Sequence, residues 1–297
     1  MISSGSSVYL CSVTQQANRK CQIDKEKLPT MKVMVKVRVC ACLVFLLPFL
    51  CLAEVGLEDA IGVWLFDEGK GEVAKDSSAN GNHGELIGGP KWVKGKFGQG
   101  LEFDGKGTSI ETESADKLTG FKLGDKTDFT ATAWFKTDQG GGFVMSKTLK
   151  AADWTGFEVK FSSGMIRTCL QTEPATVCDN RGAGLNNGKW RHVAVVFSRT
   201  KGERYVYIDG KQEGNPIDQK KVKGSIDHKN GLAIGVSMGD HRGGSFFKGI
   251  MDQVAIFKGE LTKDDIQQVM NNLEEVLSVS PVGCLTSTWA QVKLRLN

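Results

Sequence analysis

Short segments in which apolar and polar residues alternate recur along the chain, and glycine-containing turns separate them. Alternation with a period of two is typical of β-strands that bury one face. No helical pattern lies between these segments, which predicts an all-β, two-sheet antiparallel sandwich or jelly roll. The predicted strands are Ala60–Phe66, Leu101–Phe103, Ser109–Thr112, Phe129–Lys136, Gly142–Ser146, Gly156–Phe161, Met165–Thr172, His192–Phe197, Tyr205–Ile208, Gly231–Val236 and Gly249–Phe257.

Two local signals sharpen this prediction. Asp209-Gly210 between two strand-like segments predicts a tight primed turn, because both residues tolerate a positive φ. Near the end of the chain the period changes to that of a helix, predicted over residues 263–277 with Thr262 as its N-cap. Its apolar face would consist of Ile266, Val269, Met270, Leu273 and Leu277.

The N-terminal part has the order of a secretory leader. Lys32, Lys36 and Arg38 precede an apolar run from Val39 to Leu52, and Ala53 follows. This order predicts a signal peptide over residues 31–53 that is cleaved after Ala53, with retention as an N-terminal anchor as the alternative. The apolar run is short for a bilayer span, which needs about 20 residues. We therefore expect a secreted or cell-surface protein with no transmembrane segment in the mature chain.

The segments outside the predicted domain are short. Residues 1–30 are polar and without periodicity, so we expect a disordered extension, and the sequence does not decide between Met1 and Met31 as the start. The predicted domain covers residues 54–277, and residues 278–297 form a tail that contains Cys284, for which the sequence offers no role.

The basic excess of the chain lies in this leader region. Seven of the 38 Lys and Arg residues and two of the 34 Asp and Glu residues precede residue 54, so the remainder has 31 basic and 32 acidic side chains. A phosphate-binding surface needs a clustered positive field, and no run of residues after position 53 provides one. The sequence therefore argues against nucleic acid as a partner.

Cys169 and Cys178 lie in a segment that reads as two strands around the turn 172–175. In that register Cys169 faces Cys178, and opposed Cβ atoms about 4.5–5.5 Å apart permit a disulfide. Pro174 does not fit a two-residue primed turn, so the register requires a four-residue loop or a cis proline. Because secretion exposes the chain to an oxidising compartment, we predict the disulfide, with two buried thiols as the alternative.

Several phrases, taken together, resemble a known family. They are GVWLFDEG at 62–69, DSSANGN at 76–82, LEFDG at 101–105, WRHVA at 190–194 and GIMDQVAIF at 249–257. The chain resembles the laminin-G-like (LamG, concanavalin A-like) jelly-roll family, in the form found in bacterial secreted proteins. The resemblance implies a sandwich with one C-terminal helix, which agrees with the pattern of the residues.

The loop at 76–82 offers oxygen ligands at alternate positions and a glycine for a sharp turn, as calcium loops do. The resemblance implies a calcium ion between an early loop and the last strand, with Asp76 and Asp252 in matching phrases and Asp67 and Asn80 as further ligands. The alternative is that Asp76 and Asn80 cap the turn through their own backbone.

Enzymatic chemistry has little support in the sequence. Glycosidases of this fold are expected to present paired carboxylates on one strand, and the nearest phrase, Glu111-Thr112-Glu113, lacks a third acid in phase. The four histidines are scattered, and no zinc pattern or nucleophile motif is present. The sequence therefore predicts a protein that is not an enzyme.

Binding is better supported. Trp154 in one loop and Asp240 and Arg242 in another combine an aromatic ring with planar polar groups, as carbohydrate sites do. The alternatives are that Trp154 covers the edge of the core and that Asp240 and Arg242 form a solvated pair. We expect a secreted, non-catalytic module that binds a glycan or an extracellular glycoprotein, with calcium as its cofactor. A protein-adhesion module with a flat apolar patch and an atypical glycoside hydrolase with carboxylates in a concave face are the rival hypotheses.

Overall fold

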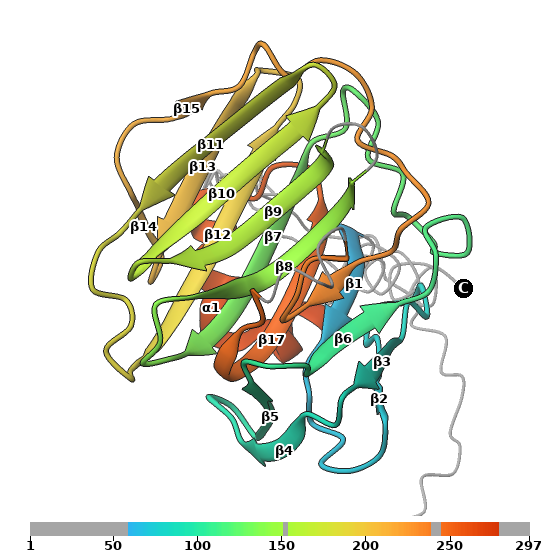
Figure 1. Cartoon of the computed structure of the whole chain (residues 1–297), viewed down its shortest axis with the longest axis vertical. Coiled ribbons are helices and arrows are strands. Elements are labelled where there is room, and N and C mark those ends of the chain that lie inside the picture. The colour runs from blue at the N-terminus through green and yellow to red at the C-terminus, as the bar shows by residue number, and fades with distance from the viewer. Residues whose placement is uncertain (1–58, 151–153, 239–244, 279–297) are drawn as a thin grey trace, which may run out of the picture. The chain divides into compact units, whose positions relative to one another are not determined.

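The structure is a computed structural model, and it describes residues 59–150, 154–238 and 245–278. Two antiparallel sheets contain all of the described strands (Figure 1). Sheet A is formed by β1 (Ala60–Trp64), β4 (Lys91–Lys94), β5 (Gln99–Asp104), β7 (Phe129–Lys136), β12 (Trp190–Ser198), β13 (Glu203–Ile208), β14 (Lys211–Gln212), β15 (Ile217–Asp218) and β17 (Lys248–Lys258). Sheet B is formed by β2 (Val73–Ala74), β3 (Gly84–Ile87), β6 (Ser109–Thr112), β8 (Gly141–Lys150), β9 (Trp154–Ser162), β10 (Met165–Thr172), β11 (Ala175–Arg181) and β16 (Ala233–Ile234).

The main core lies between the two sheets, as the alternating pattern predicts. Along β7, Phe129 and Phe135 point into this core, whereas Thr130 and Trp134 point to the other side of sheet A. The ring of Phe129 stacks on that of Phe197 with centroids 4.5 Å apart, and Phe157 of sheet B packs against both. The predicted fold, an all-β antiparallel sandwich, is confirmed.

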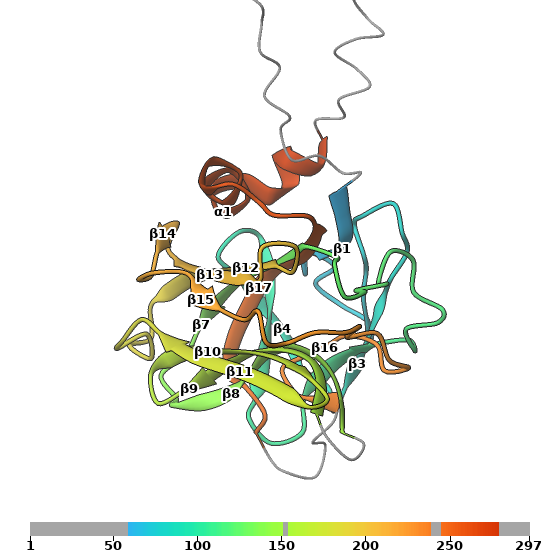
Figure 2. The same ribbon diagram turned by 90° about the horizontal axis from the view of Figure 1, so that it is seen from above.

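A second apolar layer joins α1 (Lys263–Ser278) to the outer side of sheet A (Figure 2). The helix begins where predicted, because Thr262 Oγ1 accepts a hydrogen bond from the Asp265 N–H, and Asp265 Oδ2 accepts one from the Thr262 N–H in return. Ile266, Val269 and Leu273 are buried as expected. Val276 is also buried, whereas Met270 and Leu277 are only half-buried.

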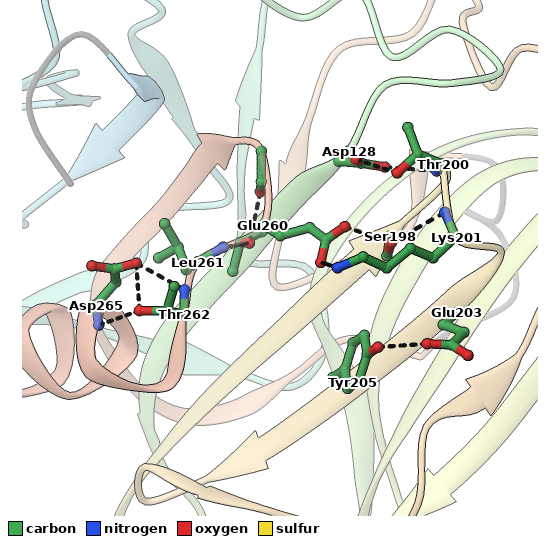
Figure 3. Close-up of polar contacts among 12 residues, drawn as sticks. Asp128, Ser198, Thr200, Lys201, Glu203, Tyr205, Glu260, Leu261, Thr262 and Asp265 are labelled. Atoms are coloured by element: carbon green, nitrogen blue, oxygen red, sulfur yellow. Dashed lines mark hydrogen bonds and ion pairs between the residues drawn. The ribbon is translucent and has the colours of Figure 1, made fainter. Parts of the chain in front are cut away.

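Polar contacts fix the start of this helix to the hairpin between β12 and β13 (Figure 3). Glu260 Oε1 accepts a hydrogen bond from Ser198 Oγ at 2.6 Å, and Glu260 Oε2 pairs with Lys201 Nζ at 2.6 Å. On the neighbouring strand the Tyr205 hydroxyl donates to Glu203. The contacts of Glu260 position the start of the helix, whereas the bond between Tyr205 and Glu203 lies within β13.

The two predicted turns are present. Asp209 and Gly210 both have positive φ, at 49° and 73°, and Ile208 pairs with Lys211 across them. Cys169 lies opposite Cys178 in the β10–β11 register, and the two residues form a disulfide with Cα atoms 4.2 Å apart. The Glu173–Pro174 peptide bond is cis, which is one of the two arrangements that keep this register.

The ends of the chain lie outside the described residues. This holds for the extension 1–30, the predicted signal peptide 31–53 and the tail with Cys284. Among the residues that the structure describes, no helix is both long and apolar enough to span a membrane.

Candidate functional site

The outer face of sheet B is the side of the sandwich opposite α1 (Figures 1 and 2). Its side chains can be assigned from the strand registers, because neighbours of core residues must point outward. Leu86 and Ile110 pair in the core, so their neighbours Glu85 and Glu111 pair on the outer face. The same transverse row continues through Ala233, Ser146, Glu158, Cys169 and Cys178.

The binding residues predicted from the sequence border this face where they are described. Trp154 is half-buried and begins β9 at the β8–β9 turn, where it pairs with Lys150. Asp240 and Arg242 lie outside the described residues. The two serines that flank their segment are described: Ser237 Oγ lies 2.8 Å from Thr148 Oγ1, and Ser245 Oγ accepts a hydrogen bond from Lys160 Nζ at 3.3 Å. Both contacts are with outward-facing side chains of sheet B.

The glutamates on the outer face of sheet B can be compared with the carboxylate pair that a glycosidase requires. Glu158 is separated from Glu111 by β16 and β8, which places their Cα atoms about 14 Å apart at three strand spacings. The carboxyl groups of a glycosidase pair are about 5–9.5 Å apart, so these two side chains would have to lean toward each other over β16 and β8 to form one. Glu85 and Glu111 are adjacent, but neither lines the groove described next, so a sugar held in that groove would not lie between them. Glu85, Glu111 and Glu158 therefore give no support to hydrolysis in that groove.

Two adjoining cavities of about 740 and 480 Å³ form a groove at one end of the sandwich. They share Asp104, Lys106 and Lys248, and the groove follows the loops 104–108, 137–142 and 245–249. We call it the end groove. Its charged lining consists of Lys91, Glu102, Asp104, Lys106, Lys136, Asp138, Lys160 and Lys248. Sequence analysis missed these residues, because they come from separate segments with no shared motif.

Asp104 differs from the other acids of the end groove because its own turn holds the carboxylate by several hydrogen bonds. Asp104 Oδ1 accepts hydrogen bonds from the backbone N–H groups of Lys106 at 2.8 Å and Gly107 at 3.1 Å, and from Thr108 Oγ1 at 2.9 Å. These bonds, led by the one from Lys106, lower the pKa of Asp104 to about 2. The carboxylate is thus a fixed part of the loop.

The four residues predicted to hold calcium fall into two separate hydrogen-bonded groups. Asp76 is buried, and its carboxylate accepts bonds from the N–H groups of Val63, Ser78 and Asn82 and from the Ser78 hydroxyl, all at 2.7 or 2.8 Å. Asn80 donates through Nδ2 to the carbonyls of Ala60 and Ile61. This geometry favours the turn-capping alternative for Asp76, whereas the Asn80 side chain ties the turn to β1.

Asp67 and Asp252 form the second group, around the turn at residues 95–99. Asp252 Oδ2 accepts hydrogen bonds from the N–H groups of Lys96 and Phe97, and Asp67 Oδ1 accepts one from Gln99 N–H. Asp252 is fully buried, and its Oδ1 has no hydrogen-bond partner within the described residues. Burial, aided by the charge of Asp67, raises the pKa of Asp252 to about 7.

An incompletely bonded buried carboxylate next to a second, exposed one suits a hard cation, which prefers oxygen ligands. Within the part of the chain that the structure describes, however, no three His, Cys, Asp or Glu side chains converge as metal ligands. Calcium stays a prediction, and Asp67 and Asp252 are the better candidates among its four predicted ligands.

Comparison with known proteins agrees with this architecture. A family model of the concanavalin A-like lectin/glucanases superfamily matches residues 104–267, more than half of the chain. The chain therefore belongs to the concanavalin A-like lectin/glucanase superfamily, and the resemblance seen in its motifs is confirmed. No curated protein sequence matches the chain.

Solved structures share the fold at low sequence identity. The binding domain of Paraclostridial Mosquitocidal Protein 1 superimposes with a TM-score of 0.59 at 15% identity, over 73% of this chain and 53% of that one. The botulinum neurotoxin serotype G binding domain gives 0.55 at 13% identity, over 71% and 50%. Domain 4 of AbnA, an extracellular arabinanase from Geobacillus stearothermophilus, in complex with arabinotriose, gives 0.50 at 19%, over 71% and 98%. The chain thus spans about half the length of the toxin domains, and these identities show the fold alone.

Proposed function

We propose that this protein is a secreted, non-catalytic module that binds a carbohydrate or a glycoprotein surface through the end groove and the adjoining outer face of sheet B. The observation that supports this proposal best is the wide groove at the end of the sandwich, which is lined by charged side chains and adjoins the outer face of sheet B. Sugar ligands need such planar polar groups on a rigid scaffold.

The apolar surface argues in the same direction. Among the described residues, the large hydrophobic side chains that are exposed are Val73 on the edge strand β2 and Ile87 on its neighbour β3. A protein-adhesion module would present a contiguous apolar patch. The complex of the arabinanase domain with arabinotriose is a further reason to place a sugar first, and the botulinum neurotoxin DC binding domain in complex with synaptotagmin II keeps a protein receptor as the rival.

Calcium is part of the proposal, with Asp67 and Asp252 as the side-chain ligands. Ca²⁺ takes six to eight oxygen ligands, so carbonyls and water would complete the set. The ion would neutralise the buried carboxylate of Asp252 and hold the 95–99 turn against β17. Calcium should raise the melting temperature of the chelator-treated protein, and Asp252→Asn should abolish this shift. An equal shift in both proteins would place the ion elsewhere.

A glycan array with and without a calcium chelator tests the binding function. We expect selective binding to a small group of glycans, weakened by Lys248→Ala in the end groove and by Trp154→Ala at the β8–β9 turn. Lys94→Ala is the matched control, because Lys94 is equally exposed on β4 but lies outside the groove. Binding to no glycan under either condition, with capture of a protein receptor instead, would contradict the carbohydrate proposal.

Secretion has its own test. Sequencing the N-terminus of the exported protein should give Glu54 as the first residue if the predicted signal peptide is cleaved after Ala53. A membrane-bound product that still contains residues 31–53 would favour the anchor.

A further inference from the structure

The end groove brings together lysines that the sequence keeps apart. Lys91, Lys106, Lys136, Lys160 and Lys248 come from five different segments and line the two joined cavities. The chain after residue 53 is close to neutral, with 31 basic and 32 acidic residues. The lysine cluster is therefore a local property of this end of the sandwich and does not reflect a generally basic protein.

These lysines are not paired with acids of the fold. None of the five forms an ion pair with another described residue. Two of the three acids in the groove are already engaged: Asp104 accepts the hydrogen bonds of its own turn, and Asp138 accepts one from Gln139. The lining therefore carries five ammonium groups against three carboxylates, an excess of two positive charges, so the groove has a positive field.

The strand registers space the cations across the floor of the groove. Lys91 pairs with Glu102, Glu102 with Ile250, and Ile250 with Lys136, on β4, β5, β17 and β7. Three strand spacings place Lys91 and Lys136 about 14 Å apart. Such a separation suits a ligand that bears several negative charges along its length better than a single small anion.

The aromatic content of the groove indicates how a ligand is held there. Phe103 and Phe161 contribute to the lining but are buried, and only Phe246 is partly exposed. Neutral sugars and single-stranded nucleic acids rely on accessible rings for stacking. The groove offers ammonium groups in place of rings, so ionic contacts must supply its affinity.

We propose that the end groove binds an acidic polysaccharide, a chain of sugars with carboxylate or sulfate groups. This inference rests on the proposed function and names the ligand class of the same site. Lysine ammonium groups would contact the anionic substituents, and Glu102, between Lys91 and Lys136, would face sugar hydroxyls.

The test measures binding of the purified chain to polygalacturonate, dextran sulfate and neutral dextran, with a thymidine oligonucleotide as a fourth probe. The two acidic polymers separate carboxylate from sulfate recognition. The variant Lys106→Glu/Lys248→Glu reverses two exposed groove charges. The control variant Lys94→Glu/Lys122→Glu reverses two equally exposed lysines outside the groove, and it leaves the net charge the same as in the test variant.

We expect binding to at least one acidic polymer and not to dextran, with affinity that falls as salt rises. At separations of about 6 Å in water, Coulomb's law predicts roughly a tenfold loss of affinity for each reversed lysine at low salt. The groove variant should therefore lose roughly a hundredfold in affinity, and the control variant should lose much less. The melting temperatures of both variants report whether the fold is intact.

Three results would overturn the inference. The first is an equal loss of affinity for the acidic polymers in the two double variants. The second is binding of the oligonucleotide as tightly as the acidic polymers, with the same loss of affinity in the groove variant. The third is failure of both acidic polymers to bind. If neutral glycans on the array still bind in the last case, only the acidic class is wrong. If no glycan or glycoprotein binds at all, the proposed function itself is wrong.

Discussion

Replacing Asp76 by alanine tests whether this carboxylate caps a turn or holds calcium. In the structure its two oxygens accept four hydrogen bonds, from three backbone N–H groups and the Ser78 hydroxyl. The Asp76 carboxylate joins β1 to the turn at 76–82, because it accepts one hydrogen bond from Val63 on β1 and another from Asn82 in the turn. Alanine would leave all of these donors without their acceptor.

The loss of unfolding free energy in Asp76→Ala can be estimated from the burial of the donors that bond to Asp76. The bonds from the Val63 and Asn82 N–H groups are buried, so each donor would lose about 1–3 kcal/mol when left unsatisfied. The Ser78 N–H is partly buried, and water can replace part of its bond. The sum is about 3–6 kcal/mol, a large share of the 5–15 kcal/mol by which a typical domain is stable. Asp76→Asn keeps one acceptor oxygen and should cost about half as much.

Urea denaturation of the three proteins in the presence of a chelator measures these free energies of unfolding. The expected order of stability is wild type, Asp76→Asn and Asp76→Ala, with similar denaturant dependence throughout. A loss below about 1 kcal/mol for the alanine variant would refute the hydrogen-bond accounting. Calcium that stabilises the wild type but neither variant would show that Asp76 is a calcium ligand.

Three further predictions concern other parts of the fold. Removal of the disulfide by Cys169→Ser/Cys178→Ser should cost about 2–3 kcal/mol for so short a loop, and reduction of the wild type should raise its intact mass by two hydrogens. Burial lowers the pKa of His192 to about 3. Below the ordinary histidine pKa, near 6.5, the unfolded chain therefore binds a proton that the folded one does not, and stability falls as pH falls. Between pH 7.5 and 5 the wild type should lose about 2 kcal/mol more than His192→Gln in urea titrations, and equal losses would contradict the assignment. Leu273→Ala on the buried face of α1 should cost about 2–5 kcal/mol, whereas the exposed Glu274→Ala should be nearly neutral in the same denaturation assay.

The sequence predicts strands where burial of one face enforces alternation, and it fails where this condition is absent. The central strands β7 and β12 were predicted because each has core residues at every second position. β3 has a single inward residue, Leu86, and β2 has two residues in all, so neither produces a pattern. The missed β4, with sequence KWVK, is an edge strand with exposed lysines at both ends.

The last strand, β17, contains an irregularity that the sequence pattern did not predict. In β17, Met251 and Val254 both face the core although they are three residues apart. Gln253 has a positive φ of 45°, and the pairing with β7 shifts between Asp252 and Ala255, which is a β-bulge. A bulge inserts one residue into the alternation, so its position depends on the partner strand and cannot be found from one segment. The same bulge adjoins the buried Asp252.

The candidate site was less predictable than the fold, because binding surfaces are assembled from loops that are distant in the sequence. Charge analysis by runs of residues found no positive cluster after residue 53, and the lysines of the end groove indeed form no run. Lys91, Lys136 and Lys248 meet because β4, β5, β17 and β7 are neighbours in sheet A, whereas Lys106 lies in the loop after β5 and Lys160 on β9 of sheet B. Strand order in a sandwich is a long-range property, and a local motif does not contain it.

The predicted calcium ligands show that the sequence also does not reveal which hydrogen bonds a buried carboxylate receives. Asp76 and Asp252 are both buried aspartates in characteristic phrases, and nothing in the sequence separates them. The difference lies in their donors: Asp76 receives four hydrogen bonds, whereas Asp252 receives two at one oxygen and none from described residues at the other. A buried carboxylate with a full set of donors has little to gain from a cation, and one with an unpaired oxygen has a free-energy cost that a cation would remove. Calcium should therefore stabilise the protein through Asp252 and leave the contribution of Asp76 unchanged.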